Sequence, residues 1–289
     1  MNYTLVLSAA LGALDDDTVK AASAFVGGSP HWLAPGTACE FRLSTTVEIE
    51  AVRKALAGRQ VDANIVPSER RRKRLLIADM DSTIIGCECI DELAAFAGIK
   101  PQIAAVTERA MRGEVPFETS LRERVALLKG LPQQTLERVF TERVRLNDGA
   151  HILVQTMAAH GAATALVSGG FTFFTSRVAQ AAGFATHQAN ELVIENNALA
   201  GTVREPILGR DAKRDALLNL AREHSIDLAD TLAIGDGAND LAMITEAGLG
   251  IAYRAMPIVA DAAHARIDHS DLTAALYLQG YRETDFVME

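Results

Sequence analysis

Short apolar runs that end abruptly in polar residues mark the second part of the chain. Leu75 to Ala78, Ala163 to Val167 and Thr231 to Ile234 do not alternate apolar and polar positions, which is typical of strands covered on both faces in a parallel sheet. Segments with helical periodicity lie between these runs, at about 148–160, 171–182 and 210–224. Because strands and helices alternate, the pattern predicts an α/β fold with a doubly wound, Rossmann-like parallel sheet.

The first 70 residues show a different pattern. Strands are expected near 3–8, 38–44 and 60–66, with amphipathic helices near 15–26 and 47–58. We therefore predict a small α+β domain over residues 1–70, in which His31 lies in a loop, and a larger domain over 71–289. The basic run from Arg70 to Arg74 joins them, and we interpret it as a solvated linker in preference to a docking patch.

Two segments interrupt the larger domain. Residues 87–147 are mostly helical and too long for a simple crossover connection, so we predict a helical cap inserted over the ends of the strands. Residues 184–204 contain two apolar runs separated by Asn196-Asn197, which predicts a β-hairpin on the core.

Composition and charge exclude several classes of protein. The chain is 49% hydrophobic, which indicates a folded protein with a sizeable core, and its net charge of −9 argues against nucleic acid as a partner. Three cysteines are too few for a disulfide framework and favour a reducing, cytoplasmic location. The uncharged stretch from Gly149 to Ser176 is broken by glycines, so we expect a soluble protein without a membrane span.

Carboxylates follow two of the three buried runs. Asp79 and Asp81 come after the first run and Asp236 after the third, and the carboxyl ends of parallel strands meet at one edge of a sheet. Three converging carboxylates repel one another unless a cation lies between them, and oxygen ligands favour Mg²⁺. The alternative is that each aspartate only forms a turn or caps a helix.

The spacing of these residues suggests phosphate chemistry. Asp79 can attack phosphorus to form an aspartyl-phosphate, and Asp81 can protonate the leaving oxygen and then accept a proton from water. Ser168 and the amides of Gly169 and Gly170, in a loop before a helix, can hold phosphate oxygens. Lys213 is the best candidate to offset the negative charge.

The motifs resemble a known family. Asp79-Met80-Asp81-Ser82-Thr83, Ser168-Gly169-Gly170, Lys213 and Gly235-Asp236-Gly237-Ala238-Asn239-Asp240 occur in that order, as in haloacid-dehalogenase-like phosphatases. The chain is most similar to the phosphoserine phosphatases within them, because Glu88 lies seven residues after Asp81 and because Met111, Phe117 and Arg124 occupy a cap of similar pattern.

This resemblance implies an activity and a set of roles. It implies hydrolysis of O-phospho-L-serine, the last step of serine biosynthesis, with Asp79 as nucleophile and Asp81 as acid and base. It implies Mg²⁺ held by Asp79, the backbone carbonyl of Asp81 and Asp236, with Asp240 supporting the metal ligands and Asn239 contacting phosphate. It also gives the N-terminal domain a likeness to the ACT fold, and therefore a serine-binding role and a homodimer as expectations.

Phosphoserine needs an anion for its ammonium group and a cation for its carboxylate. Glu88 and Arg124 are the right types, and Arg suits a planar carboxylate. Met111 and Phe117 can close the site and exclude water. The alternatives are ordinary packing for these two residues, a helix-start carboxylate for Glu88, and for Arg124 a surface ion pair with Glu123 or a neighbouring turn.

Two other functions fit part of the pattern. A phosphatase acting on another small phosphomonoester would use the same carboxylates. A phosphorylated signalling module also presents an acidic Mg²⁺ site on a parallel sheet, but it has little use for the acid that Asp81 provides, and the cap would block a protein partner.

Overall fold

The N-terminal part of the chain forms an antiparallel sheet with two helices. The computed structural model describes residues 2–288 except Thr46, Gly113 and Arg210. The elements are β1 (Tyr3–Ser8), α1 (Asp16–Val26), β2 (His31–Ala34), β3 (Ala38–Leu43), α2 (Ile49–Ala55) and β4 (Asp62–Pro67), with strand order β2-β3-β1-β4. The loop predicted for His31 is wrong, because this residue lies in β2 and pairs with β3. A four-residue edge strand beside Pro30 carries too little pattern to be recognised from sequence.

The second part of the chain is built on a six-stranded parallel sheet, which confirms the predicted α/β fold. Its strands are β5 (Leu75–Ala78), β6 (Ala163–Phe171), β7 (Thr186–Asn190), β10 (Thr231–Gly235), β11 (Leu249–Tyr253) and β12 (Ala265–Ile267). Their order is β12-β11-β10-β5-β6-β7, so the chain grows from β5 in both directions, as a doubly wound sheet requires.

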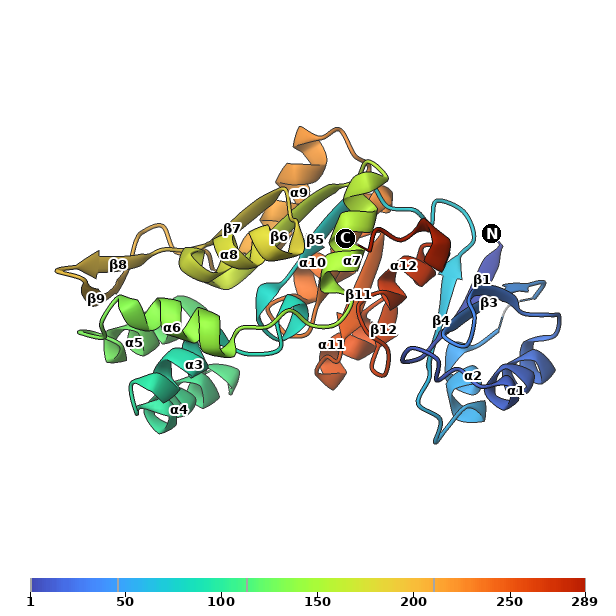
Figure 1. Cartoon of the computed structure of the whole chain (residues 1–289), viewed down its shortest axis with the longest axis horizontal. Helices are drawn as coiled ribbons and strands as arrows, with labels where there is room; N and C mark the ends of the chain where they lie inside the picture. The colour runs from blue at the N-terminus through green and yellow to red at the C-terminus, as the bar shows by residue number, and fades with distance from the viewer. Residues whose placement is uncertain (1, 46, 113, 210, 289) are drawn as a thin grey trace.

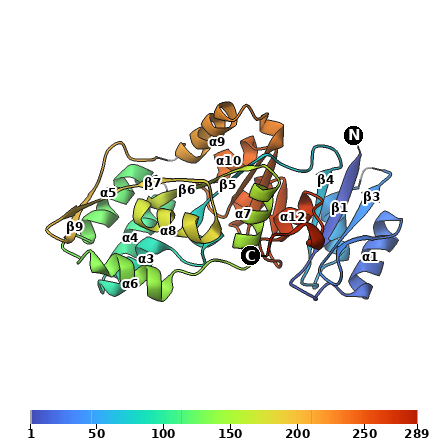
Figure 2. The same ribbon diagram turned by 45° about the horizontal axis from the view of Figure 1, so that its top comes forward.

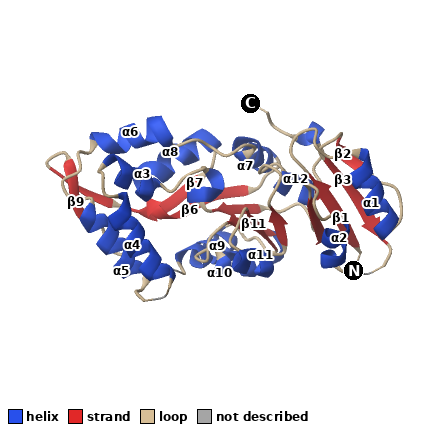
Figure 3. Cartoon of the chain, turned by 90° about the horizontal axis from the view of Figure 1, so that it is seen from below, coloured by secondary structure: helices blue, strands red, loops and turns tan. Residues whose placement is uncertain are grey.

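Helices cover both faces of this sheet, as Figure 3 shows. On one side lie α7 (Ala150–Ala159), α8 (Thr172–Ala182) and α12 (Ala274–Leu278), and on the other α9 (Ala212–Glu223), α10 (Leu241–Glu246) and α11 (Pro257–Ala262). Successive residues of β5 point to opposite faces, so Leu76 packs with the first set and Leu75 and Ile77 with the second. Burial on both faces explains why the β5 sequence is continuously apolar.

Four helices form a cap at one end of the molecule (Figures 1 and 2). They are α3 (Cys89–Phe96), α4 (Lys100–Met111), α5 (Phe117–Leu127) and α6 (Gln134–Arg143). A single antiparallel bridge between Ile85 and Leu146 brings the two connections to the core side by side.

The hairpin of β8 (Leu192–Glu195) and β9 (Ala198–Val203) packs on this cap. The Gly130 amide donates to the Leu199 carbonyl at 2.8 Å, and the Leu199 amide donates to the Leu131 carbonyl at 2.9 Å. The expected position on the core is therefore wrong. Part of the predicted hairpin belongs instead to β7, which joins the core sheet, and the remaining residues reach outward from the end of that strand.

The basic run contacts both domains closely. Arg71 forms an ion pair with Glu40 at 2.7 Å in which both side chains are mostly buried, and it also donates to the carbonyls of Tyr277 and Leu278. The Asp62 carboxylate also joins the two domains, because it accepts hydrogen bonds from three successive backbone amides, those of residues 268–270. The interpretation of this run as a solvated linker is wrong for Arg71, which docks the N-terminal domain on the larger one, whereas Arg70, Arg72 and Arg74 are exposed as expected.

Within the described part of the chain, no helix is long and apolar enough to cross a bilayer. The uncharged stretch that could suggest a membrane span is divided among α7, β6 and the start of α8. Close to the C-terminus, the Val287 amide donates to the Thr156 hydroxyl of α7 at 2.9 Å, and Figure 1 shows this part of the chain beside α7.

Candidate active site

Three neighbouring strands of the parallel sheet end at the same edge and deliver polar residues there. Asp79 follows β5 directly, Asp236 follows β10 directly, and Ser168 lies near the end of β6. The predicted loop at Ser168-Gly169-Gly170 is wrong, because β6 continues through these residues to Phe171 and α8 starts at once. Glycines weaken the strand signal in the sequence, which is why this extension was not apparent.

Asp79 belongs to a buried charged triad. The Lys213 ammonium, near the start of α9, lies 2.6 Å from Asp79 Oδ1 and 2.6 Å from Asp240 Oδ1. Burial, reinforced by the Asp240 carboxylate, raises the pKa of Asp79 well above its usual range. Burial also disfavours the charged form of Lys213, but the carboxylates of Asp240 and Asp79 outweigh it and raise its pKa. The lysine is therefore a fixed positive charge beside Asp79.

The end of β10 lies so close to the Asp240 side chain that position 235 has no room for a side chain of its own. A Cβ atom at position 235 would lie 2.4 Å from Asp240 Cγ, so only glycine allows the Asp240 carboxylate to approach the end of β10. The Gly237 amide donates to Asp240 Oδ2 at 3.0 Å. These contacts hold Asp240 in the position where it pairs with Lys213.

Asp81 is held by hydrogen bonds to both oxygens. The Cys89 amide, at the start of α3, donates to Oδ1 at 2.8 Å, and the Ser168 hydroxyl donates to Oδ2 at 3.1 Å. Between Asp81 and Cys89 the chain turns sharply at Ser82, whose φ is 57°. Burial raises the pKa of Asp81, and its hydrogen bond from Cys89 works in the opposite direction. A raised pKa suits a carboxyl group that must carry and release a proton.

Asp236 completes an acidic cluster. Carboxylate oxygens of Asp79, Asp236 and Asp240 lie within 4.8 Å of one another. The Thr83 hydroxyl donates to Asp236 Oδ1 at 2.8 Å, and burial raises the pKa of Asp236 to about 6. Three carboxylates form a hard, oxygen-only donor set, so these residues fit a hard divalent cation such as Mg²⁺. Thr83 was not singled out from the sequence, although it lies in the same motif as Asp79.

Ser168 and the two glycines after it lie against Asp81 and the cap. A Cβ at position 170 would lie 2.9 Å from Asp81 Oδ2, and a Cβ at position 169 would lie 3.1 Å from the Phe117 ring. Asn190 donates to the Gly169 carbonyl at 3.0 Å and fixes this segment from behind. The lack of side chains leaves the backbone open to a bound group.

A cavity of about 750 Å³ lies between this edge of the sheet and the cap. From the core it is lined by Asp79, Asp81, Ser168, Gly169, Asp236 and Asn239, and from the cap by Glu88, Phe117 and Arg124. Lys213 and Asp240 lie buried behind Asp79. The side chain of Met111 lies outside the described residues. Residues from distant parts of the sequence therefore share one cavity.

Glu88 and Arg124 are the charged groups that the cap contributes. Burial, with repulsion from Asp81, raises the pKa of Glu88 to about 7, although the Ser82 hydroxyl donates to its carboxylate at 2.6 Å. The alternative ion pair of Arg124 with Glu123 is wrong, since Glu123 pairs with Arg109 at 2.8 Å. Arg124 forms no ion pair within 4.0 Å among the described residues, and burial lowers its pKa. A partly buried guanidinium that has no carboxylate partner among the described residues is suited to an anionic ligand.

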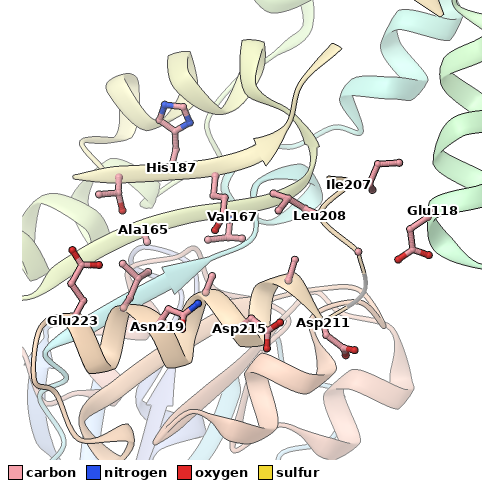
Figure 4. Close-up of a pocket in the computed structure, with 16 residues that line it drawn as sticks. Glu118, Ala165, Val167, His187, Ile207, Leu208, Asp211, Asp215, Asn219 and Glu223 are labelled. Atoms are coloured by element: carbon pink, nitrogen blue, oxygen red, sulfur yellow. The ribbon is translucent and has the colours of Figure 1, made fainter. Parts of the chain in front are cut away.

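A second cavity, of about 740 Å³, opens between β7 and α9 (Figure 4). Four carboxylates line it, those of Glu118, Asp211, Asp215 and Glu223, and its described lining residues include no lysine or arginine. A phosphate group would meet only negative charge there. The chemistry that the sequence predicts is therefore possible in the first cavity and not in this one.

Comparison with known proteins decides the family. The model of the haloacid dehalogenase-like hydrolases matches residues 76–245, which include every motif at the edge of the sheet. The chain belongs to this family. It is 44% identical to the phosphoserine phosphatase of Archaeoglobus fulgidus over 202 residues, 70% of this chain and 58% of that protein. The chain spans about three fifths of the length of the first curated relatives that it matches.

Solved structures of haloacid dehalogenase-like hydrolases extend the likeness to both domains. A family member from Salmonella enterica serovar Typhi superposes with a TM-score of 0.86 at 31% identity, covering 96% of this chain and 98% of its own. A probable phosphoserine phosphatase from Vibrio cholerae superposes with a TM-score of 0.79 at 32% identity, covering 98% of this chain and 88% of its own. The resemblance that the sequence motifs suggested is confirmed.

Proposed function

We propose that this hydrolase converts O-phospho-L-serine to L-serine and phosphate through an aspartyl-phosphate on Asp79, as the last step of serine biosynthesis. The observation that carries the proposal is one cavity lined by Asp79 and Asp81, which suit phosphate chemistry, and also by Glu88 and Arg124, which suit an amino acid. The names of the relatives from Archaeoglobus and Vibrio support the same substrate.

The chemistry has two steps. Asp79 attacks phosphorus, the ester bond to serine breaks, and Asp81 protonates the departing serine oxygen. Asp81 then accepts a proton from the water that attacks the aspartyl-phosphate, which regenerates Asp79 and releases phosphate. The bonds from Cys89 and Ser168 to Asp81 keep its carboxyl group in place for both transfers.

Other residues of the core would bind the transferred group. Ser168, the amides of Gly169 and Gly170, and Asn239 would hold phosphate oxygens, and Lys213 would offset negative charge on Asp79 and the phosphate. Mg²⁺ would be held by Asp79, the backbone carbonyl of Asp81 and Asp236, supported by Asp240. When bound, the ion supplies positive charge at the phosphate oxygens.

The cap would recognise the amino acid. Glu88 would pair with the substrate ammonium group and Arg124 with its carboxylate, while Phe117 and Met111 would close the site against water. Arg124 has no ion pair with any described residue, which supports this role, because a substrate carboxylate would then complete its bonding.

The domain division belongs to the same proposal. Residues 1–70 form an ACT-like unit and 71–289 the phosphatase, with the cap at about 87–147. The β1-α1-β2-β3-α2-β4 order supports the ACT likeness, and with it serine binding and a homodimer. Free cysteines at positions 39, 87 and 89 support a reducing cytoplasm.

Phosphate release from L-phosphoserine, measured with Mg²⁺ and after chelation, tests the function. We expect rapid release with Mg²⁺, near-complete loss with chelator and recovery when Mg²⁺ is added back. Phosphothreonine and an aryl phosphate serve as comparison substrates and should be hydrolysed less efficiently. Equal rates on all three would contradict the assignment of phosphoserine, and full activity in chelator would contradict the metal.

A further inference from the structure

Ser120 carries a buried hydroxyl that has no hydrogen-bond partner in the part of the chain that the structure describes. It lies in α5, its side chain is 1% exposed, and its Oγ atom is unpaired among the described residues. Buried polar groups are nearly always paired, so an unpaired one calls for a physical reason. Ser120 also lines the cavity between the core and the cap, which distinguishes it from Tyr253, whose buried hydroxyl is unpaired but lines none of the described cavities.

The position of Ser120 places it beside Arg124. The two residues are four apart in one helix and therefore lie on the same face. Arg124 Nε donates to the Ser120 backbone carbonyl at 3.3 Å, and both residues line the same cavity. Two groups that lack a partner within the described chain, a hydroxyl donor and a guanidinium, are thus neighbours on one turn of α5.

We propose that the Ser120 hydroxyl donates a hydrogen bond to the substrate carboxylate that Arg124 binds, and so helps to select amino-acid phosphates over simple phosphate esters. The inference rests on the proposed function. A carboxylate has about four acceptor sites, and a bidentate arginine uses two of them. A neutral hydroxyl satisfies a third without adding charge near Glu88.

A substrate that lacks a carboxylate should then bind less tightly than phosphoserine. Phosphoethanolamine carries the same phosphate and ammonium groups as phosphoserine but no carboxylate. In the wild-type site it would leave both the hydroxyl and the guanidinium unpaired, and sites built to hydrogen-bond a substrate group discriminate strongly against analogues that lack it.

A purely structural role for Ser120 makes different predictions. Its hydroxyl could rotate toward the carbonyl of Pro116, which already accepts the Ser120 amide at 3.0 Å, as helical serines often do. A variant would then lose activity equally on all substrates, or not at all, because no substrate group would contact the hydroxyl.

The test compares Ser120→Ala with Thr119→Ala, which removes an exposed hydroxyl from the same helix. For Ser120→Ala we expect kcat/KM for phosphoserine to fall about tenfold, mainly through KM. In the same variant kcat/KM for phosphoethanolamine should change less than about twofold. Thr119→Ala should have the kcat/KM of the wild type on both substrates. If Ser120→Ala does not fold, Ser120→Cys, a weaker donor of similar size, is measured in the same way.

The outcomes separate this inference from the proposed function. A wild-type enzyme that does not hydrolyse phosphoserine overturns the function and the role of Ser120 with it. If the wild type does hydrolyse phosphoserine, an unchanged constant in the Ser120 variant, or equal losses on phosphoserine and phosphoethanolamine, overturns the role of Ser120 alone.

Discussion

Asp79 and Asp81 are two residues apart, but their oxygens meet different partners. Among the described residues the Asp79 carboxylate pairs with the Lys213 ammonium through Oδ1, whereas both oxygens of Asp81 accept hydrogen bonds, from Cys89 and Ser168. A group that attacks phosphorus needs a free lone pair, and a group that transfers protons needs a fixed orientation. The contacts therefore match the two proposed roles at the level of single atoms.

Replacing Asp79 by Asn should abolish turnover while preserving the fold. The amide has the same shape but cannot attack phosphorus, so we expect phosphoserine hydrolysis below about one thousandth of the wild-type rate. Phosphate release is measured alongside phosphoserine binding by calorimetry. Substantial hydrolysis by Asp79→Asn would rule out a covalent step at this residue.

Arg124→Ala should affect substrates according to their carboxylate. We expect KM for phosphoserine to rise on the order of tenfold to a hundredfold, because a charge-assisted bond is lost, and KM for an aryl phosphate to change little. Arg122→Ala, on the same helix but paired with Glu205 at the surface, is the matched control. Parallel losses on both substrates in Arg124→Ala would contradict its carboxylate role.

At the scale of elements, the sequence predicts best where periodicity and burial agree. β5 and β10 are recognisable because both faces are buried, and most predicted helices end close to the observed ones. β7 was missed as a core strand because its sequence, Thr-His-Gln-Ala-Asn, is polar at a mostly exposed edge. No periodicity shows that the hydroxyl of Ser120 lacks a partner among the described residues, since this depends on how α5 faces the core.

The packing of the β8–β9 hairpin against the cap can be tested by replacing two glycines with alanine. Gly201 and Gly130 both have φ of 81°, but a Cβ at 201 would lie 2.8 Å from Lys129 Cβ, whereas a Cβ at 130 meets nothing within 4 Å. Alanine at either position should cost about 1–2 kcal/mol from its left-handed backbone. At 201 overpacking should add about 1–3 kcal/mol.

Urea unfolding of Gly201→Ala and Gly130→Ala provides the measurement. A larger loss of unfolding free energy in Gly201→Ala supports the close contact between β9 and Lys129, which follows α5. Equal losses would mean that the hairpin can move away from the cap without cost.

At the scale of the whole molecule, the two domains meet through buried polar contacts. These contacts join residues that are far apart in the chain, such as Asp62 with the amides of 268–270 and Arg71 with the carbonyls of Tyr277 and Leu278. A sequence pattern does not show contacts with residues about 200 positions away, which explains why the docking of Arg71 was not predicted although most of its run is exposed. The catalytic motifs were easier to place, because the ends of parallel strands must converge.

Arg71→Ala should destabilise the protein by about 3 kcal/mol, because it leaves Glu40 buried without its partner. Arg204→Ala removes an arginine whose ion pair with Glu191 is exposed and should cost less than about 1 kcal/mol. Urea unfolding monitored by fluorescence compares the two variants. A difference below about 0.5 kcal/mol, the usual effect of a surface substitution, would show that the buried pair does not hold the domains together.

The central claim is that Asp79 becomes phosphorylated during turnover. Wild-type enzyme is mixed with phosphoserine and Mg²⁺, quenched in acid within one turnover and reduced with borohydride, which converts an aspartyl-phosphate to homoserine. Peptide mass spectrometry then locates the changed residue. We predict homoserine at position 79 and nowhere else, and none in Asp79→Asn. Homoserine at another aspartate would contradict this claim. An absence of homoserine in samples quenched within one turnover, while the wild type hydrolyses phosphoserine, would contradict it as well.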